Sequence, residues 1–158
     1  MAEPVFTGEY EYAVDSQRRV PLPKDWRREL GDSAVLYMYP RDGGIEVMPE
    51  ALFNLSMMSL IRSMGLRERA RVAAKTHRCV CDKQGRITLS QKLMNEVGIS
   101  DHALMVGTYV SIFLLPPDSW TPDDQDTTPQ MQHISDLEKQ GAFLNPHHES
   151  SSTPFGDA

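Results

Sequence analysis

The strongest constraint on this chain is an internal repeat. Residues 13–53 align without a gap on residues 80–120 at a shift of 67 positions, and ten of the 41 aligned pairs are identical. The identical pairs are Asp15/Asp82, Gln17/Gln84, Arg19/Arg86, Leu22/Leu89, Glu29/Glu96, Gly31/Gly98, Ser33/Ser100, Met38/Met105, Ile45/Ile112 and Pro49/Pro116. Chance does not concentrate ungapped identities at turn and core positions in this way. We therefore interpret the chain as a duplicated unit.

Each unit predicts the same order of elements. Alternating apolar residues predict strands on both sides of a polar turn, and a short helix that ends at glycine follows. Two more strands then complete the unit. In the first unit we expect strands at 10–14, 19–22, 34–40 and 44–49, with a helix at 23–30. In the second unit we expect strands at 77–81, 86–89, 103–107 and 111–116, with a helix at 90–97.

Two helices are predicted between the units. The first begins after Pro49 and ends near Gly65, and its apolar side chains recur on one face, which predicts a helix packed on the core. These side chains are Leu52, Phe53, Met57, Leu60, Ile61 and Met64. The second helix is basic and covers 66–75. The expected organisation is a first unit at 6–53, connecting helices at 54–76, a second unit at 77–120 and a tail at 121–158.

The repeat also predicts the fold class. A unit of about 40 residues cannot close a hydrophobic core alone, whereas two related units can interlock. We expect a β-rich α+β protein in which the two units form a pseudo-twofold β-barrel. The two polar turns then occupy equivalent positions.

The negative charge lies in the tail. Residues 121–158 carry seven acids and one base, whereas residues 1–120 are neutral, with fifteen of each. Within that neutral body, residues 62–86 have a local charge of +6 and residues 18–28 one of +4, so a face that binds a polyanion remains open. The tail is rich in Pro, Asp and Ser and is predicted to be largely disordered. A short helix around Met131, Ile134 and Leu137 either docks or stays disordered.

The polar turns are the candidate site. Asp15 and Arg19 stand four residues apart in the first turn, as Asp82 and Arg86 do in the second. We expect the arginines to contact DNA, because guanidinium groups pair with phosphates and with guanine edges. The alternative is a pair of exposed ion pairs with a purely local role. The side chains of Arg18 and Lys83 add charge to the same turns.

Other classes of site find little support. Cys79 and Cys81 are expected to be reduced and buried, and their spacing along one strand with His77 is not that of a zinc site. No nucleophile elbow, phosphate loop or HExxH pattern occurs. No apolar run is long enough to span a membrane, and the N-terminus lacks the features of a signal peptide. We expect a cytoplasmic non-enzyme without a metal or cofactor.

The sequence resembles the MraZ family, within the SpoVT–AbrB superfamily of swapped-hairpin DNA-binding proteins. The resemblance rests on FTGEYEYAVDSQRR, CDKQGRITL, LMNEVGI, ALMVG, PPDSW and the paired Asp-x-x-x-Arg turns, and it covers residues 6–120. It implies two tandem SpoVT–AbrB-like units in a double-split barrel. By the same resemblance, Arg19 and Arg86 match DNA-contacting arginines, and Asp15 and Asp82 match acids that shape the turns. Gly85 matches a family glycine that the first unit replaces with Arg18, a costly residue if that position needs positive φ.

The resemblance also implies a function. It predicts a nucleoid-associated regulator that represses the division and cell-wall gene cluster and assembles as a homo-oligomeric ring on repeated promoter sites. The alternative is an antitoxin-like or scaffold module that binds proteins, with DNA binding as a secondary property.

Overall fold

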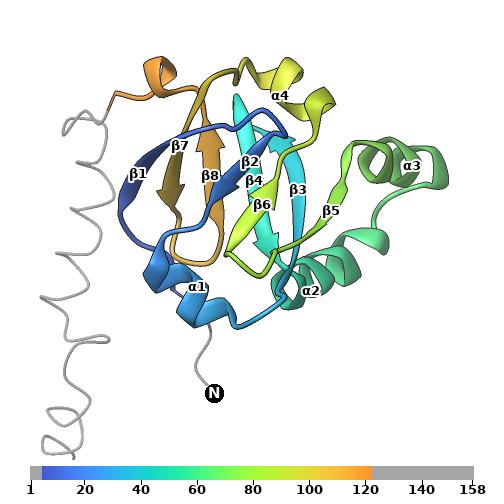
Figure 1. Ribbon diagram of the computed structural model, residues 1–158. Helices are drawn as coiled ribbons and strands as arrows, with labels where there is room; N and C mark the ends of the chain where they lie inside the picture. Colours follow the sequence, from blue (N-terminus) through green and yellow to red (C-terminus); the bar gives the residue numbers. More distant parts are fainter. Residues whose placement is uncertain (1–4, 122–158) are drawn as a thin grey trace, which may run out of the picture. The chain divides into compact units, whose positions relative to one another are not determined.

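The computed structural model describes residues 5–121, and the predictions for the tail lie outside this range. The described residues form an α+β fold dominated by antiparallel strands (Figure 1). The first half contains β1 (Glu9–Ala13), β2 (Arg19–Pro21), α1 (Lys24–Leu30), β3 (Val35–Arg41) and β4 (Gly44–Pro49). The connecting helices are α2 (Glu50–Ile61) and α3 (Leu66–Lys75). The second half contains β5 (His77–Val80), β6 (Arg86–Thr88), α4 (Gln91–Val97), β7 (His102–Gly107), β8 (Ile112–Leu115) and the 3₁₀ turn η1 (Pro117–Ser119).

The two halves have matching elements. The bounds of β6 and α4 lie 67 residues after those of β2 and α1. Each of these helices is followed by a glycine with φ of 84°, Gly31 after α1 and Gly98 after α4. The β3–β4 hairpin has positive φ at Asp42 and Gly43, the conformation of a two-residue hairpin turn, as the sequence predicts.

Strand pairing exchanges elements between the halves. The larger sheet has the order β1-β7-β8-β4-β3-β5, so the first strand of each half pairs with the third strand of the other. The two pairings share one register, because Tyr12 lies opposite Ala103 and their counterparts Cys79 and Leu36 also lie opposite each other. The larger sheet ends at β1 and β5, and the described pairing does not close into a barrel. Strands β2 and β6 form a separate two-stranded ribbon.

One hydrophobic core joins the halves. Val20 and Ile87 from the ribbon and Met38 and Met105 from the larger sheet are fully buried in the same cluster. The ring of Trp26 on α1 packs edge-on against the ring of Phe6, with 5.6 Å between their centroids. Since both halves supply this core, neither can fold around it alone.

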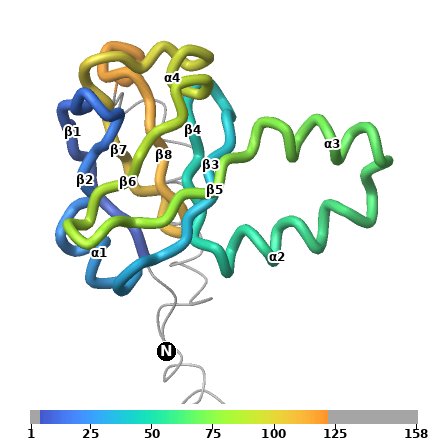
Figure 2. Tube along the Cα trace, turned by 45° about the vertical axis from the view of Figure 1, so that its right-hand side comes forward, coloured from blue at the N-terminus to red at the C-terminus, as the bar shows by residue number. Residues whose placement is uncertain are grey.

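The prediction that α2 packs its apolar face on the core is wrong. No residue of α2 or α3 is buried, and the two helices project from the sheets as a hairpin (Figure 2). Phe53 stacks on Tyr37 of β3 with 4.0 Å between the ring centroids, but Leu60 and Ile61 of the predicted face are 45% and 44% exposed. The reason is that α2 carries apolar residues around most of its circumference, and the sheet covers only one side.

The remaining features concern reactivity and membranes. Cys79 and Cys81 are free, and burial raises the pKa of both thiols, which keeps them protonated at neutral pH. Cys81 is buried, while Cys79 is only half-buried.

No three His, Cys, Asp or Glu side chains within residues 5–121 are grouped to hold a metal ion. In that same range, each helix is too short or too polar to cross a membrane.

Candidate nucleic-acid interface

The first polar turn is organised by the carboxylate of Asp15. Its Oδ1 accepts hydrogen bonds from the backbone N–H groups of Gln17 and Arg19, at 2.9 and 2.8 Å. Its Oδ2 accepts a hydrogen bond of 2.7 Å from Nε of Arg19. The acid therefore fixes both the backbone of the turn and the side chain of the arginine that ends it.

The second turn repeats this geometry. Oδ1 of Asp82 accepts from the backbone N–H groups of Gln84 and Arg86 at 2.9 and 2.8 Å, and Oδ2 accepts from Nε of Arg86 at 2.9 Å. In both turns the arginine side chain is 28% exposed and the aspartate side chain 36% exposed. The duplicated sequence thus yields two nearly superimposable hydrogen-bond networks.

The hydrogen bonds also set the charge of the turns. The backbone N–H of Arg19 is the largest influence that lowers the pKa of Asp15, and the backbone N–H of Arg86 does the same to the pKa of Asp82. Both acids are therefore ionised at neutral pH. They act as turn-shaping and arginine-orienting groups.

Both arginines lie on the outer face of the ribbon. Arg19 is opposite Thr88 and Arg86 is opposite Pro21 in the antiparallel register, and residues directly opposite each other share a face. The other face carries Val20 and Ile87, which are fully buried. The two arginines start β2 and β6, so the turns stand at opposite ends of one short ribbon. Only Nε of each guanidinium is bonded within residues 5–121, which leaves both Nη groups able to donate to a ligand.

The remaining residues predicted for the site divide into two groups. Lys83 is exposed at the second turn, as a DNA-contacting residue must be. Arg18 has φ of 61° and Gly85 has φ of 78°, so the position before each arginine has positive φ, the condition under which arginine is the costlier residue. The side chain of Arg18 is half-buried, and its Nε donates to the backbone oxygen of Leu89 at 3.0 Å. The Nε of Arg18 is thus used in a backbone contact, and its two Nη groups are left to donate to a ligand.

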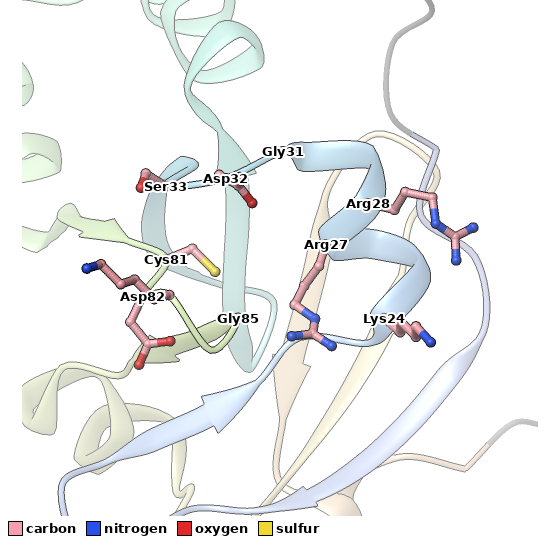
Figure 3. Close-up of a pocket in the computed structure, with 10 residues that line it drawn as sticks. Lys24, Arg27, Arg28, Gly31, Asp32, Ser33, Cys81, Asp82 and Gly85 are labelled. Carbon is pink, nitrogen blue, oxygen red and sulfur yellow. The ribbon is translucent and has the colours of Figure 1, made fainter.

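A hollow of about 560 Å³ lies between α1 and the second turn (Figure 3). Cations outnumber acids among its lining residues, which are Lys24, Arg27, Arg28, Gly31, Asp32, Ser33, Cys81, Asp82, Lys83 and Gly85. The counterparts of nine of these residues line an equivalent hollow between α4 and the first turn. There, Gln91, Met94 and Asn95 replace the three cations of α1.

This difference between the hollows is the part of the site that the sequence reasoning missed. From the sequence, Lys24, Arg27 and Arg28 contribute to the local charge of +4, and no contact with the second turn is predicted for them. The alignment of the repeats nevertheless pairs them with three uncharged residues of α4. The basic helix α3 stands on the projecting hairpin and not beside the ribbon (Figure 2).

Comparisons with known proteins identify the family. A curated relative from Caldicellulosiruptor bescii, named "Transcriptional regulator MraZ", is 30% identical over 123 residues, which cover 72% of this chain and 82% of the relative. The chain belongs to the MraZ family. Residues 72–132 also match the family model described as "MraZ protein, putative antitoxin-like".

Other MraZ relatives extend the match. The "Transcriptional regulator MraZ" of Clostridium acetobutylicum is 27% identical over 129 residues, covering 73% of this chain and 84% of the relative. The protein of the same name from Lachnoclostridium phytofermentans is 26% identical over 138 residues and covers 84% of this chain and 97% of the relative. The MraZ resemblance seen in the sequence is thereby confirmed.

Proposed function

We propose that this MraZ family member is a sequence-specific DNA-binding transcriptional regulator whose DNA-binding surface is the outer face of the β2–β6 ribbon. One observation carries the proposal: Arg19 and Arg86 lie on the same outer face, and an aspartate holds each guanidinium in the same geometry. The names of the relatives, all transcriptional regulators, support it.

The geometry suits a DNA groove. A two-stranded ribbon fits the major groove, where the fork of an arginine can donate two hydrogen bonds to a guanine edge. Each guanidinium is oriented before binding, so less side-chain entropy is lost on contact with DNA. Lys83 and the outer nitrogens of Arg18 supply phosphate contacts on either side. In this proposal Asp15, Asp82 and Gly85 shape the turns and do not touch DNA.

The architecture belongs to the same proposal. We infer that the halves arose by duplication and correspond to two SpoVT–AbrB-like units, 6–53 and 77–120, joined through 54–76. We describe the fold of the two units together as a swapped-hairpin, double-split β-barrel. This description is supported by the exchange of strands between the halves and by the β2–β6 ribbon between them. Because Arg18 precedes Arg19 whereas Gly85 precedes Arg86, we expect unequal contributions from the two turns.

The assembly we propose is a homo-oligomeric ring. Its support in this chain is the exposed apolar surface of α2, where Leu55, Met58 and Ile61 recur every third residue. Such a surface is typical of a protein–protein contact. A ring would place several ribbons on repeated promoter sites, and tethering would multiply their weak affinities. We propose that the ring represses the division and cell-wall gene cluster at the nucleoid.

The decisive test is DNA binding by an Arg19→Ala/Arg86→Ala double variant. The probe is duplex DNA from upstream of the protein's own gene, bound over a series of salt concentrations. We expect strong loss of affinity and a plot of log K against log salt that is flatter by about 0.9 for each lost phosphate contact. The control is Arg41→Ala, which removes a cation from the β3–β4 hairpin. Unchanged affinity and slope in the double variant would reject the ribbon as the DNA-binding surface.

A protein-interaction module is the second candidate. The exposed face of α2 and the antitoxin-like description of the matched family model favour it. This candidate predicts that a protein partner binds through α2 and that loss of both turn arginines leaves the protein's function in cells unchanged. Loss of promoter repression in the double variant would decide for the regulator.

A further inference from the structure

The two turns differ at the residue that precedes the DNA-facing arginine. This residue is Arg18 in the first turn and Gly85 in the second, and both have positive φ. Each also bonds through its carbonyl oxygen to the opposite strand: Leu89 N–H donates to Arg18 at 2.7 Å, and Leu22 N–H donates to Gly85 at 2.9 Å. The same backbone position is therefore built with a long side chain in one half and with none in the other.

In the second turn the missing side chain is replaced from outside. Arg27 of α1 extends toward Gly85 (Figure 3), and its Nη1 donates to the carbonyl oxygen of Gln84 at 2.9 Å. A Cβ atom added to Gly85 would overlap the Arg27 side chain. Arg27 thus fills the space beside the glycine and bonds the residue before it.

The first turn has the reverse arrangement. The counterpart of Arg27 is Met94 on α4, whose thioether side chain has no hydrogen-bond donor, while Arg18 donates from its own Nε to the Leu89 carbonyl at 3.0 Å. A guanidinium therefore bonds a backbone carbonyl in both halves: Arg18 bonds Leu89 across the ribbon, and Arg27 bonds Gln84 within the second turn. It comes from the turn itself in the first half and from the neighbouring helix in the second.

We propose that Arg27 is a positioning residue of the second turn, which holds Gln84 and Gly85 so that Arg86 keeps its DNA-binding orientation. The inference rests on the proposed function, since it concerns how the ribbon is prepared for DNA. Glycine gives the turn more freedom than any other residue would, and fixing that freedom before binding raises affinity.

Stability alone does not explain the placement of Arg27. Its Nε is buried and has no hydrogen-bond partner within residues 5–121. A buried donor without a partner is unfavourable, and an apolar residue of similar length, such as the methionine at the equivalent position of α4, would avoid it. The choice of arginine over such a residue at this position therefore indicates a role at the turn.

The test is Arg27→Met, which gives α1 the residue that α4 carries. The control is Arg28→Asn, which likewise gives α1 the residue of α4 one position later. Within residues 5–121 the Arg28 side chain pairs only with the exposed Asp25. We expect Arg27→Met to weaken promoter binding by about 5- to 20-fold in the wild-type background and to leave the salt dependence of the Arg86→Ala variant unchanged, because Arg27 itself contacts no phosphate in this proposal. Arg28→Asn should change affinity by less than about twofold.

A double-mutant cycle separates positioning from direct contact. If Arg27 acts through the second turn, Arg27→Met has no further effect when Arg86 is already alanine and keeps its full effect when Arg19 is alanine. A full effect in the Arg86→Ala background, or a salt slope lowered by about a further 0.9 in that same background, would overturn the proposal in favour of a direct phosphate contact.

Rescue gives the second readout. Arg27→Met/Gly85→Arg recreates at the second turn the arrangement of the first, and it should recover most of the affinity that Arg27→Met loses.

Amide hydrogen exchange of the DNA-free protein provides the third readout. Arg27→Met should speed exchange at the amide of Gly85 and leave exchange at the amide of Arg18 unchanged. Unchanged exchange at Gly85 would reject the positioning role of Arg27, even if the ribbon does bind DNA. If exchange at Gly85 becomes faster but Arg86→Ala does not affect DNA binding, the proposed function is rejected, whereas the positioning role of Arg27 at the second turn stands.

Discussion

Val20 pairs with Ile87, its own counterpart in the repeat, at the centre of the β2–β6 ribbon. Glu46 and Phe113, also 67 residues apart, pair in the same way between β4 and β8. A residue can lie opposite its own counterpart only where a local twofold axis passes between the strands. The axis therefore runs through both sheets, and it places the two Asp-x-x-x-Arg turns at symmetric ends of the ribbon.

The first prediction concerns the buried face of this ribbon. Val20 and Ile87 are fully buried, so truncation of either side chain leaves a cavity in the shared core. We expect Val20→Ala to lower the free energy of unfolding by about 2 kcal/mol and Ile87→Ala by about 3 kcal/mol. Denaturant titration measures both values. Thr88→Ala, on the exposed face of the same ribbon, is the control and should change stability by less than about 0.5 kcal/mol. Equal effects of all three would contradict the placement of the core.

The second prediction concerns the turn acids. Asp82→Ala removes the acceptor for two backbone N–H groups and for Arg86, whereas Asp82→Asn keeps an oxygen at the place of Oδ1. We expect both variants to fold. The alanine variant should bind promoter DNA more weakly than the asparagine variant, because only the latter keeps the backbone of the turn. Affinities for the same duplex at one salt concentration measure the difference, and the reverse order would contradict the assigned role of the acid.

The pH dependence of stability follows from the same contacts. Hydrogen bonds from Arg19 and Arg86 lower the pKa of Asp15 and Asp82 in the folded protein. Their stabilising effect is therefore present in full above the unfolded-state pKa of about 3.9 and is lost as the pH falls through the lower folded-state pKa. We expect the stability difference between wild type and Asp15→Asn/Asp82→Asn to be constant from pH 7 to about 5 and to shrink below about pH 4. A difference that grows in acid would contradict the sign of the shift.

The sequence predicted much of the fold because its signals are local and occur twice. Alternating residues around each turn, glycine after each short helix and the Asp-Gly hairpin all act within a few residues, and each element was found where the repeat placed it. The exchange of β1 and β5 between the halves could not be derived in the same way. Pairing partners such as Tyr12 and Ala103 are distant in sequence, and apolar alternation is satisfied by any strand that offers a complementary face.

The site was predicted only as far as each turn is self-contained. Asp15 bonds residues two and four positions later, so its network could be expected from the motif alone. The approach of Arg27 to Gly85 joins residues from different halves and has no local signal. The packing of α2 was misjudged because its apolar residues lie around most of its circumference, so their spacing does not show which side the sheet covers.

The fourth prediction concerns the strained position in the first turn. Arg18 adopts φ of 61°, which costs a non-glycine residue about 1 kcal/mol, and its Nε bond to Leu89 returns a similar amount. Arg18→Gly loses the bond and relieves the strain, so thermal unfolding should change little. Arg18→Ala loses the bond and keeps the strain, and it should be less stable than the glycine variant by about 1 kcal/mol. An alanine variant as stable as the glycine variant would show that the turn does not hold this residue at positive φ.

The last prediction concerns the exposed side of α2. Leu55 and Met58 lie three residues apart, are mostly exposed and belong to a helix that this chain covers on one side only. If this surface joins copies of the chain, Leu55→Lys/Met58→Lys should dissolve the oligomer into smaller species in light scattering while circular dichroism stays unchanged. The double variant should also lose tenfold or more in affinity for DNA with several repeats and little for DNA with one, because only multivalent binding depends on tethering. Asn54→Lys, an exposed polar position on the same helix, is the matched control and should leave the oligomer intact. An intact oligomer in the double variant would place the contact between copies elsewhere on the chain, and equal losses on both DNAs would indicate that α2 supports the fold of each protomer.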